Sequence, residues 1–278
     1  MKTDRDIINL ARYPLDDLDS EQGVRFIEQV RAELAGDGSC TLPGFVVPEI
    51  LVRMAAEAES LEPVAYAGPT EVTPYYFNYR LGEGMDLDDA HPLKHRGQRN
   101  LRQVAADLIP ENHLLSILFH GQLMPEFLGR VQGQTIYRNQ DRYQSLNINL
   151  QDEGGCQQWH FDTAHMVTTL LLQAPEAGGV FEYCPNIRSD ENENFDDVRN
   201  VLDGRSDRVR KLHLEAGMLS LFKGHYSMHR VTPVRGSIRR IQAILGYTSI
   251  PNLTGSVESS ILHYGPRVAE IEGKPRDC

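Results

Sequence analysis

The sequence predicts one α+β domain in which a β-sandwich or barrel is buttressed by helices. Residues 1–133 place many apolar side chains at helical spacing, whereas from about Gln134 the chain changes to short β-runs separated by Gly, Pro and Asn. Many short strands after a helical half are typical of α+β domains. The 278 residues suffice for one large core, and we find no internal repeat or low-complexity tract that divides them.

Two helices and a short strand are expected first. The run from Glu21 to Leu34 has apolar residues close to a 3.6-residue period, and Gly36 follows as a stop signal. A second helix is expected over residues 48–62, because Pro48 is tolerated at an early helical position. The segment CTLPGFVV between the two helices has the features of a short strand after a turn.

The remainder of the N-terminal part is expected to hold a lid loop and two more helices. Residues 64–98 are rich in Tyr, Gly and Asp without a clear period, and loops of this length in a compact domain are often functional. Residues 100–131 have apolar rows that predict two helices broken near Pro110.

The second half is expected to form the β core over residues 134–255, followed by a C-terminal tail over residues 256–278. Residues 186–211 form a polar insertion with one short helix around Phe195–Leu202. The runs expected as strands are TIYRN, YQSLNINLQ, QQWHFD, MVTTLLLQ, GGVFEYCP, GMLSLFK, HRVTPV and IRRIQAILGYTSI.

The composition excludes several kinds of partner. With 28 basic and 39 acidic side chains the formal charge is −11, a poor match for phosphate backbones or anionic membrane surfaces. No stretch approaches the ~18 uninterrupted apolar residues of a membrane span. The first residues, MKTDRDIINLARYPLDD, contain no apolar signal segment. We therefore expect a cytoplasmic protein without a nucleic-acid or membrane partner; a homodimer is left open.

The cysteines and histidines differ in what they suggest. Cys40, Cys156, Cys184 and Cys278 are far apart and form no C-x-x-C pair, which argues against a disulfide scaffold or a zinc ribbon and favours buried small residues. The ten histidines are therefore the place to look for chemistry.

One histidine and a nearby aspartate are placed to bind a metal. In QQWHFDTAH, His160 and Asp162 are two residues apart in a β-run, so their side chains share one face of the strand. His229 lies in another expected strand and supplies a second imidazole. Two imidazoles and one carboxylate on one face of an octahedral ion are the facial triad of non-haem Fe(II) oxygenases. His213 and Glu215 form a competing His-x-acid pair, for which a surface role is favoured.

The runs WHFD and TTLLLQAPEAGGVFEYCPNIRS, followed by GMLSLFKGHYSMHRVTPVRGSIRR, resemble the Fe(II)/2-oxoglutarate-dependent oxygenase superfamily. Within it, the chain is similar to the free-amino-acid halogenases and their hydroxylating relatives, and the similarity extends weakly to INLARYPLD, LPGF and PYYFNYR. The resemblance implies a distorted double-stranded β-helix, or jelly roll, with N-terminal and flanking helices. It also implies oxidative decarboxylation of 2-oxoglutarate to succinate and CO₂ by Fe(II) and O₂, with ascorbate in support, coupled to attack on an unactivated C–H bond.

Asp162 distinguishes outcomes within this group. Halogenating members replace the carboxylate ligand by a small residue, which makes room for chloride on the iron, whereas this sequence keeps Asp162. Hydroxylation of a small free substrate, most simply an amino acid, is therefore the leading expectation. Desaturation or ring closure stays open, because both use the same metal ligands.

The resemblance also implies an arginine that binds the distal carboxylate of 2-oxoglutarate, about ten residues after the second histidine. Arg239 and Arg240 are ten and eleven residues after His229, and strand alternation lets only one of them face inward. The pattern favours Arg240, with Arg239 as the alternative. Thr169 could donate its hydroxyl to the same carboxylate, and Asn147 and Asn149 share one strand face that could line the site.

Residues that would recognise the substrate are less distinct. The candidates are Tyr79, Arg80, His120, Asp141 and Arg188, and His165 and His225 lie near both ligand segments. Two other classes of function are weighed. A zinc-dependent hydrolase would use His160, Asp162 and His229 around an activated water but would have no use for 2-oxoglutarate. A jelly-roll binding module without turnover would have no use for the metal triad.

Overall fold

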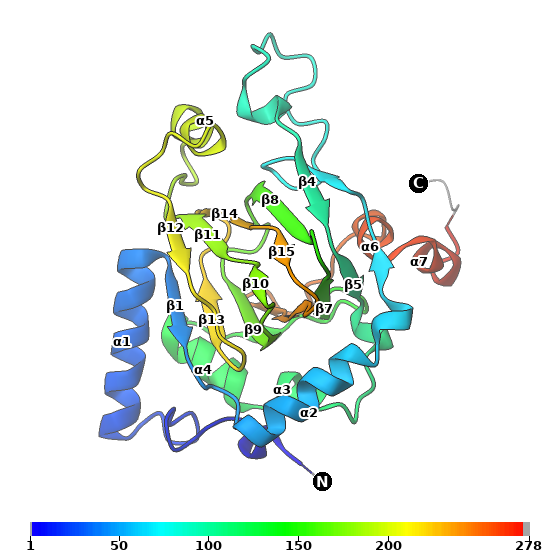
Figure 1. Ribbon diagram of the computed structural model, residues 1–278. Coiled ribbons are helices and arrows are strands. Elements are labelled where there is room, and N and C mark those ends of the chain that lie inside the picture. Colours follow the sequence, from blue (N-terminus) through cyan, green and yellow to red (C-terminus); the bar gives the residue numbers. More distant parts are fainter. Residues whose placement is uncertain (1, 275–278) are drawn as a thin grey trace.

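Two antiparallel sheets that pack face to face form the centre of the protein, seen in a computed structural model that describes residues 2–274 (Figure 1). The larger sheet has seven strands in the order β1-β13-β9-β16-β7-β5-β2, and the smaller has six in the order β12-β11-β14-β8-β4-β3. Their contact is direct, since the Phe222 ring of the larger sheet meets the His229 ring of the smaller one edge to face at 4.8 Å. The expected α+β jelly roll with flanking helices is confirmed.

The larger sheet consists of β1 (Ser39–Leu42), β13 (Leu219–Phe222), β9 (Val167–Gln173), β16 (Arg240–Leu245), β7 (Leu146–Gln151), β5 (Arg102–Val104) and β2 (Tyr66–Ala67). The smaller sheet consists of β12 (Arg210–Leu212), β11 (Phe181–Cys184), β14 (Met228–Val231), β8 (Cys156–His160), β4 (Gly97–Asn100) and β3 (Glu71–Val72). Two short ribbons are formed by β10 (Ala177–Gly178) with β15 (Val234–Arg235) and by β6 (Tyr137–Arg138) with β17 (Tyr247–Thr248).

The helices are α1 (Glu21–Asp37), α2 (Pro48–Glu59), α3 (Leu114–His120), α4 (Leu123–Gln132), α5 (Phe195–Leu202), α6 (Val257–Tyr264) and α7 (Pro266–Ile271). Short 3₁₀ turns are η1 (Asp4–Asp6), η2 (Glu62–Val64), η3 (Pro92–Lys94) and η4 (Ala106–Leu108). Periodicity predicted α1 and the early proline predicted α2. The α1 helix begins at a Ser20 cap whose side chain accepts the Gly23 N–H, and it ends at a left-handed Gly38 rather than at the predicted stop, Gly36.

Alternation along the larger sheet separates its two faces. Leu170, Ile241 and Leu150 are buried in the main apolar core together with residues of α1 to α4, which lie along the outside of this sheet in Figure 1. The opposite face, toward the smaller sheet, carries polar side chains. Because successive residues of a strand point to opposite sides, a β-run that reads as half polar can still be fully buried.

Three expectations about the elements were wrong or incomplete. Residues 102–104, where the first helix of the 100–131 pair was expected, form β5, and residues 97–100, at the boundary between that helix and the expected loop, form β4. Pairing with β7 and β8 overrides local propensity here. The break between α3 and α4 falls at Gly121–Gln122, not near Pro110. The 64–98 segment is not only a loop but contains β2, β3 and η3, and the 186–211 insertion adds β12 beside the expected α5.

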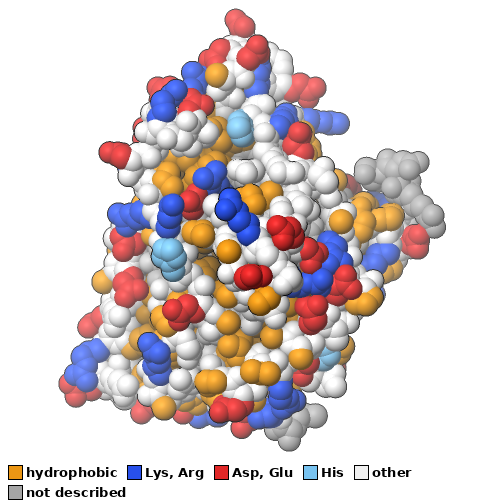
Figure 2. All heavy atoms as spheres, viewed as in Figure 1, with side chains coloured by type: hydrophobic (Ala, Val, Ile, Leu, Met, Phe, Trp, Pro, Cys, Tyr) orange, Lys and Arg blue, Asp and Glu red, His pale blue; other side chains and the backbone are white. Residues whose placement is uncertain are grey.

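Within the segment expected to be a tail, residues 257–271 form α6 and α7, which pack against each other and against Tyr143. The cysteine prediction stands for three residues, as Cys40, Cys156 and Cys184 are buried free thiols; Cys278 lies outside the described residues. Over residues 2–274, no helix combines the length and apolar character needed to cross a membrane. Acidic and basic side chains are interspersed over the face shown in Figure 2.

Candidate metal centre

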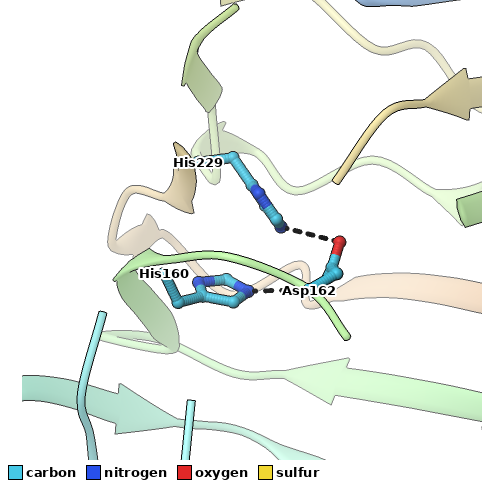
Figure 3. A group of neighbouring side chains, drawn as sticks. All are labelled: His160, Asp162 and His229. Atoms are coloured by element: carbon cyan, nitrogen blue, oxygen red, sulfur yellow. Dashed lines mark ion pairs between the residues drawn. The ribbon is translucent and has the colours of Figure 1, made fainter. Parts of the chain in front are cut away.

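Two side chains of the smaller sheet and one from the turn after β8 converge on one point (Figure 3). The Asp162 carboxylate lies 3.2 Å from Nε2 of His229 and 3.8 Å from Nε2 of His160. His160 and His229 are paired across β8 and β14, and their ring centroids are 4.2 Å apart. Asp162 lies just after the end of β8 rather than within it, so its position is set by the following turn as well as by strand alternation.

Hydrogen bonds fix the orientation of both imidazoles. Nδ1 of His160 donates to the Gln158 carbonyl at 2.8 Å, and Nδ1 of His229 donates to the Ser227 carbonyl at 3.0 Å. A neutral imidazole that donates through Nδ1 keeps its lone pair on Nε2. Both Nε2 atoms are therefore available as ligands, and both face Asp162.

Gly224 makes room for the carboxylate. Its carbonyl accepts the Asp162 N–H at 3.1 Å, and a Cβ at position 224 would lie 2.0 Å from Oδ2 of Asp162. The sequence gives only a glycine in KGHY as a signal, and this role was missed. The close approach holds the carboxylate where it can meet the two imidazoles.

Burial and mutual charge set the protonation states. Burial, and then the neighbouring His229, lowers the pKa of His160 to about 3. Burial alone would raise the pKa of Asp162, but His229 above all, and then His160, hold it below its ordinary value. At neutral pH His160 is thus neutral and Asp162 ionised, the forms in which these groups bind a metal.

Gln157 also lies at this centre, although the sequence did not single it out. The register between β14 and β8 shifts between residues 229 and 231, which is the mark of a β-bulge. As a result Gln157 and His160 both point inward, and the Gln157 amide nitrogen lies 3.0 Å from Nε2 of His160. A one-residue irregularity of this kind is not visible in the amino-acid pattern.

The two candidate arginines have opposite environments. Arg240 is 2% exposed and donates to Gln151 Oε1 at 2.9 Å and to Gln242, both neutral; within residues 2–274 it pairs with no carboxylate. Burial lowers its pKa to about 10. Arg239 instead forms ion pairs with Glu59 at 3.0 Å and Asp152 at 2.9 Å. Of these two arginines, only Arg240 is buried and lacks a carboxylate partner within residues 2–274.

A row of polar side chains accompanies Arg240 on the inner face of the larger sheet. Asn149 is paired with Gln242, and Asn147 and Thr169 flank Ile244 on its two sides, so all of them share the face of Arg240. Two buried atoms of this row, Oδ1 of Asn147 and Nε2 of Gln151, have no hydrogen-bond partner among residues 2–274. Unsatisfied buried polar atoms point to a missing ligand or water.

Arg99 is a second buried arginine, and sequence analysis missed it. It is 1% exposed on β4, opposite Gln157, and donates to Gln103. Its Nε has no partner, and no carboxylate pairs with it in the described part of the chain. Arg99 was hidden because its segment was expected to be loop and helix rather than an inward-facing strand.

Of the other candidates, Arg188 lies near the centre: its guanidinium stacks 4.0 Å over the Phe161 ring and Nε donates to the His225 carbonyl at 2.6 Å. His165 and His225 stack on each other at 4.8 Å.

The rest lie elsewhere or play a backbone role. His120 is exposed at the end of α3, and His213 is exposed after β12. Asp141 accepts backbone N–H groups from Tyr143 and Gln144, a turn role, and Arg80 is exposed in the lid loop beside Tyr79.

These residues fit an octahedral iron and a dicarboxylate co-substrate. Two imidazole nitrogens and one carboxylate are the ligand set of the facial triad, which leaves three coordination positions open. Within residues 2–274, His160, Asp162 and His229 are the one group of three such side chains close enough to hold an ion together. Arg240, which pairs with no carboxylate within residues 2–274, is a fixed cation of the kind that could bind a distal carboxylate.

Comparisons with known proteins agree with this geometry. A family model described as HalD, Halogenase D, matches residues 84–262, more than half of the chain. A search of curated proteins gave no match.

Solved structures show the same fold at low identity. AviO1 from Streptomyces viridochromogenes Tue57 superposes with a TM-score of 0.54 at 14% identity, over 82% of this chain and 97% of that one. The non-haem alpha-ketoglutarate-dependent epimerase SnoN from nogalamycin biosynthesis gives 0.54 at 11%, over 81% and 83%. An oxidoreductase of the 2OG-Fe(II) oxygenase family from Burkholderia pseudomallei gives 0.50 at 16%, over 81% and 91%. The chain therefore belongs to the halogenase D family and has the fold of the Fe(II)/2-oxoglutarate-dependent oxygenases.

Proposed function

We propose that this protein is an Fe(II)/2-oxoglutarate-dependent hydroxylase of a small free amino acid. The observation that carries the proposal is the retained Asp162 carboxylate, 3.2 Å and 3.8 Å from the two Nε2 atoms, in a family whose name is that of halogenases. With the carboxylate present, the third protein ligand position is taken and no halide has a place there.

Each residue has a defined part in this proposal. His160, Asp162 and His229 would hold Fe(II), and Arg240, with Thr169 nearby on the same sheet face, would hold the distal carboxylate of 2-oxoglutarate. When bound, iron and 2-oxoglutarate supply the oxidising power, by reduction of O₂ coupled to decarboxylation to succinate and CO₂. The structure of the epimerase SnoN with Fe³⁺ and alpha-ketoglutarate is a precedent for this pairing in the fold.

The inner faces of the sheets carry two buried cations and therefore suit two anions. Arg240 lies on the larger sheet and Arg99 on the smaller one, and neither has a carboxylate partner within residues 2–274. If 2-oxoglutarate takes Arg240, Arg99 remains for an acidic group of the substrate. A buried unpaired charge is costly, so a carboxylate on the substrate would satisfy what the protein leaves unsatisfied.

The other reaction outcomes differ in the product rather than in the site. Desaturation and ring closure would use the same ligands, and product analysis separates them from hydroxylation. A zinc hydrolase would use the same three ligands but would leave the buried Arg240 without a purpose.

The test is an anaerobic complex of the full chain with Fe(II) and 2-oxoglutarate, screened against the common L-amino acids. We expect a charge-transfer absorption band, a shift of that band with at least one amino acid, and O₂-dependent formation of succinate and a product heavier by one oxygen atom. The Asp162→Ala variant should lose substrate-coupled succinate formation. Full activity of that variant, or absence of the band in the wild type, would overturn the proposal.

A further inference from the structure

Tyr76, in the lid segment, has a backbone conformation that its residue type disfavours. Its φ is +64°, in the left-handed region, where a bulky non-glycine residue is a real outlier. The conformation is held by Thr73, which is 1% exposed: Thr73 N–H donates to the Tyr76 carbonyl at 2.8 Å, Tyr76 N–H donates back at 3.0 Å, and the Thr73 hydroxyl donates to the same carbonyl at 2.7 Å. Strain of this kind persists where the surroundings enforce it, and it concentrates at functional sites.

The strained backbone places the Tyr76 ring beside a metal ligand. Its centroid lies 5.4 Å from that of His160, and on the other side the ring stacks on His263 at 5.4 Å with an interplanar angle of 19°. The Arg99 guanidinium lies nearby, 5.5 Å from the centroid of the Phe77 ring, which itself contacts the Tyr76 ring at 4.6 Å. The Gln103 side chain that accepts from Arg99 also lies 3.1 Å from Nδ1 of His263, the partner of Tyr76 in the ring stack. Tyr76 thus joins the candidate metal centre to the second buried arginine.

A phenol beside a guanidinium can bind an anion together with it. The Tyr76 hydroxyl can accept one N–H and still donate its own proton, so a carboxylate next to Arg99 would receive an N–H bond from the arginine and an O–H bond from Tyr76. Hydrogen bonds to a charged acceptor are stronger than neutral ones, which makes this pair selective for carboxylate over amide.

We propose that Tyr76 is a specificity-determining residue that binds the carboxylate of the substrate together with Arg99, and that its left-handed backbone is kept for this purpose. The inference rests on the proposed function, since it assigns the acidic group of that substrate to a site. Tyr76 and His263 both lie outside residues 84–262, the part that matches the family model.

A neighbouring tyrosine supplies a matched control. Tyr79 belongs to the same segment, is 37% exposed, and donates its hydroxyl to the Glu71 carbonyl at 2.7 Å. Removing that hydroxyl takes one hydrogen bond from the lid without touching Arg99 or the metal centre. Tyr76→Phe and Tyr79→Phe therefore remove the same hydroxyl group, but only Tyr76→Phe removes the proposed contact with the substrate.

The experiment uses the full chain as the anaerobic Fe(II)·2-oxoglutarate complex. The probe is the L-amino acid that shifts the wild-type band most strongly, and each variant is titrated with that amino acid and with its carboxamide. We expect Tyr76→Phe to weaken binding of the amino acid by about tenfold or more, to change carboxamide binding much less, and to leave 2-oxoglutarate binding and the melting temperature unchanged. Tyr79→Phe should match the wild type throughout.

The possible failures are distinguishable. If Tyr76→Phe weakened binding of the amino acid and of its carboxamide equally, Tyr76 would only pack against the substrate and the inference would be overturned. Unchanged binding of both compounds would overturn it as well. If the wild type forms no band with 2-oxoglutarate, or no amino acid shifts the band, the proposed function fails and this inference fails with it.

Discussion

Gly224 lies so close to Asp162 that a methyl group on it would come within 2.0 Å of the carboxylate oxygen Oδ2. We predict that Gly224→Ala displaces the carboxylate and weakens Fe(II) binding by about 10- to 100-fold, the range seen when the support of a metal ligand is removed. Anaerobic Fe(II) titration in the presence of 2-oxoglutarate measures this.

Gly36→Ala is the control for that variant, because a Cβ at position 36 has no atom within 4 Å. It should bind iron as the wild type does. If Gly224→Ala bound iron as tightly as the wild type, with the fold intact by circular dichroism, then Asp162 would not be a ligand or the turn at residue 224 would shift without cost.

Arg240 and Arg239 make a second matched pair. Arg240→Gln should raise the KM for 2-oxoglutarate by about 10- to 100-fold, because a charge-assisted, two-point contact is lost. Its free energy of unfolding should not fall, since a buried charge without a protein counter-charge stabilises little.

Arg239→Gln is the control. It removes the ion pairs with Glu59 and Asp152, which are partly exposed, so it should cost about 0–1 kcal/mol of stability and leave the KM for 2-oxoglutarate unchanged. The reverse assignment of the two effects would identify Arg239 as the anchor.

The pair also illustrates what the sequence could predict. Alternation along a strand requires that one of two adjacent arginines face inward, and the His-x-Asp spacing with a distant histidine could predict that His160, Asp162 and His229 converge, because both arguments depend only on strand geometry. The α+β class and the strands of the second half followed from period and turn residues, whereas the jelly roll was implied by the resemblance to the oxygenase superfamily.

What could not be predicted depends on packing between segments far apart in the chain. Arg99 reads as part of a loop until β4 pairs with β8, and Gln157 faces the metal centre only because of a bulge. Tyr76 is left-handed because Thr73 holds it so, and no local preference of tyrosine favours that conformation. Such residues become visible only when the two sheets are placed face to face.

Acid sensitivity is predicted from His263. Burial, and then the nearby Arg99, lowers its pKa from 6.5 to about 3, and its Nδ1 lies 3.1 Å from Gln103 Oε1. Between these two pH values the unfolded chain binds a proton that the folded chain does not, so stability rises with pH across this window and is lost on acidification. His263→Gln should therefore reduce the loss of stability between pH 7 and pH 5. Urea denaturation at several pH values checks this, with His120→Gln, at an exposed position, as the control. Equal pH dependence of both variants and the wild type would contradict it.

The backbone strain at Tyr76 can be measured apart from the side chain. Tyr76→Ala and Tyr76→Gly lose the same ring contacts, but glycine adopts φ of +64° without penalty while alanine does not. We predict that Tyr76→Gly is more stable than Tyr76→Ala by about 1 kcal/mol, although glycine in an ordinary conformation is the less stable of the two by about 0.5–1 kcal/mol. Tyr75 is not among the residues with positive φ, so the order of stability at position 75 should be the opposite, with Tyr75→Ala more stable than Tyr75→Gly. Equilibrium urea denaturation of the four variants gives both differences, and the same order at the two positions would show that Tyr76 is not strained.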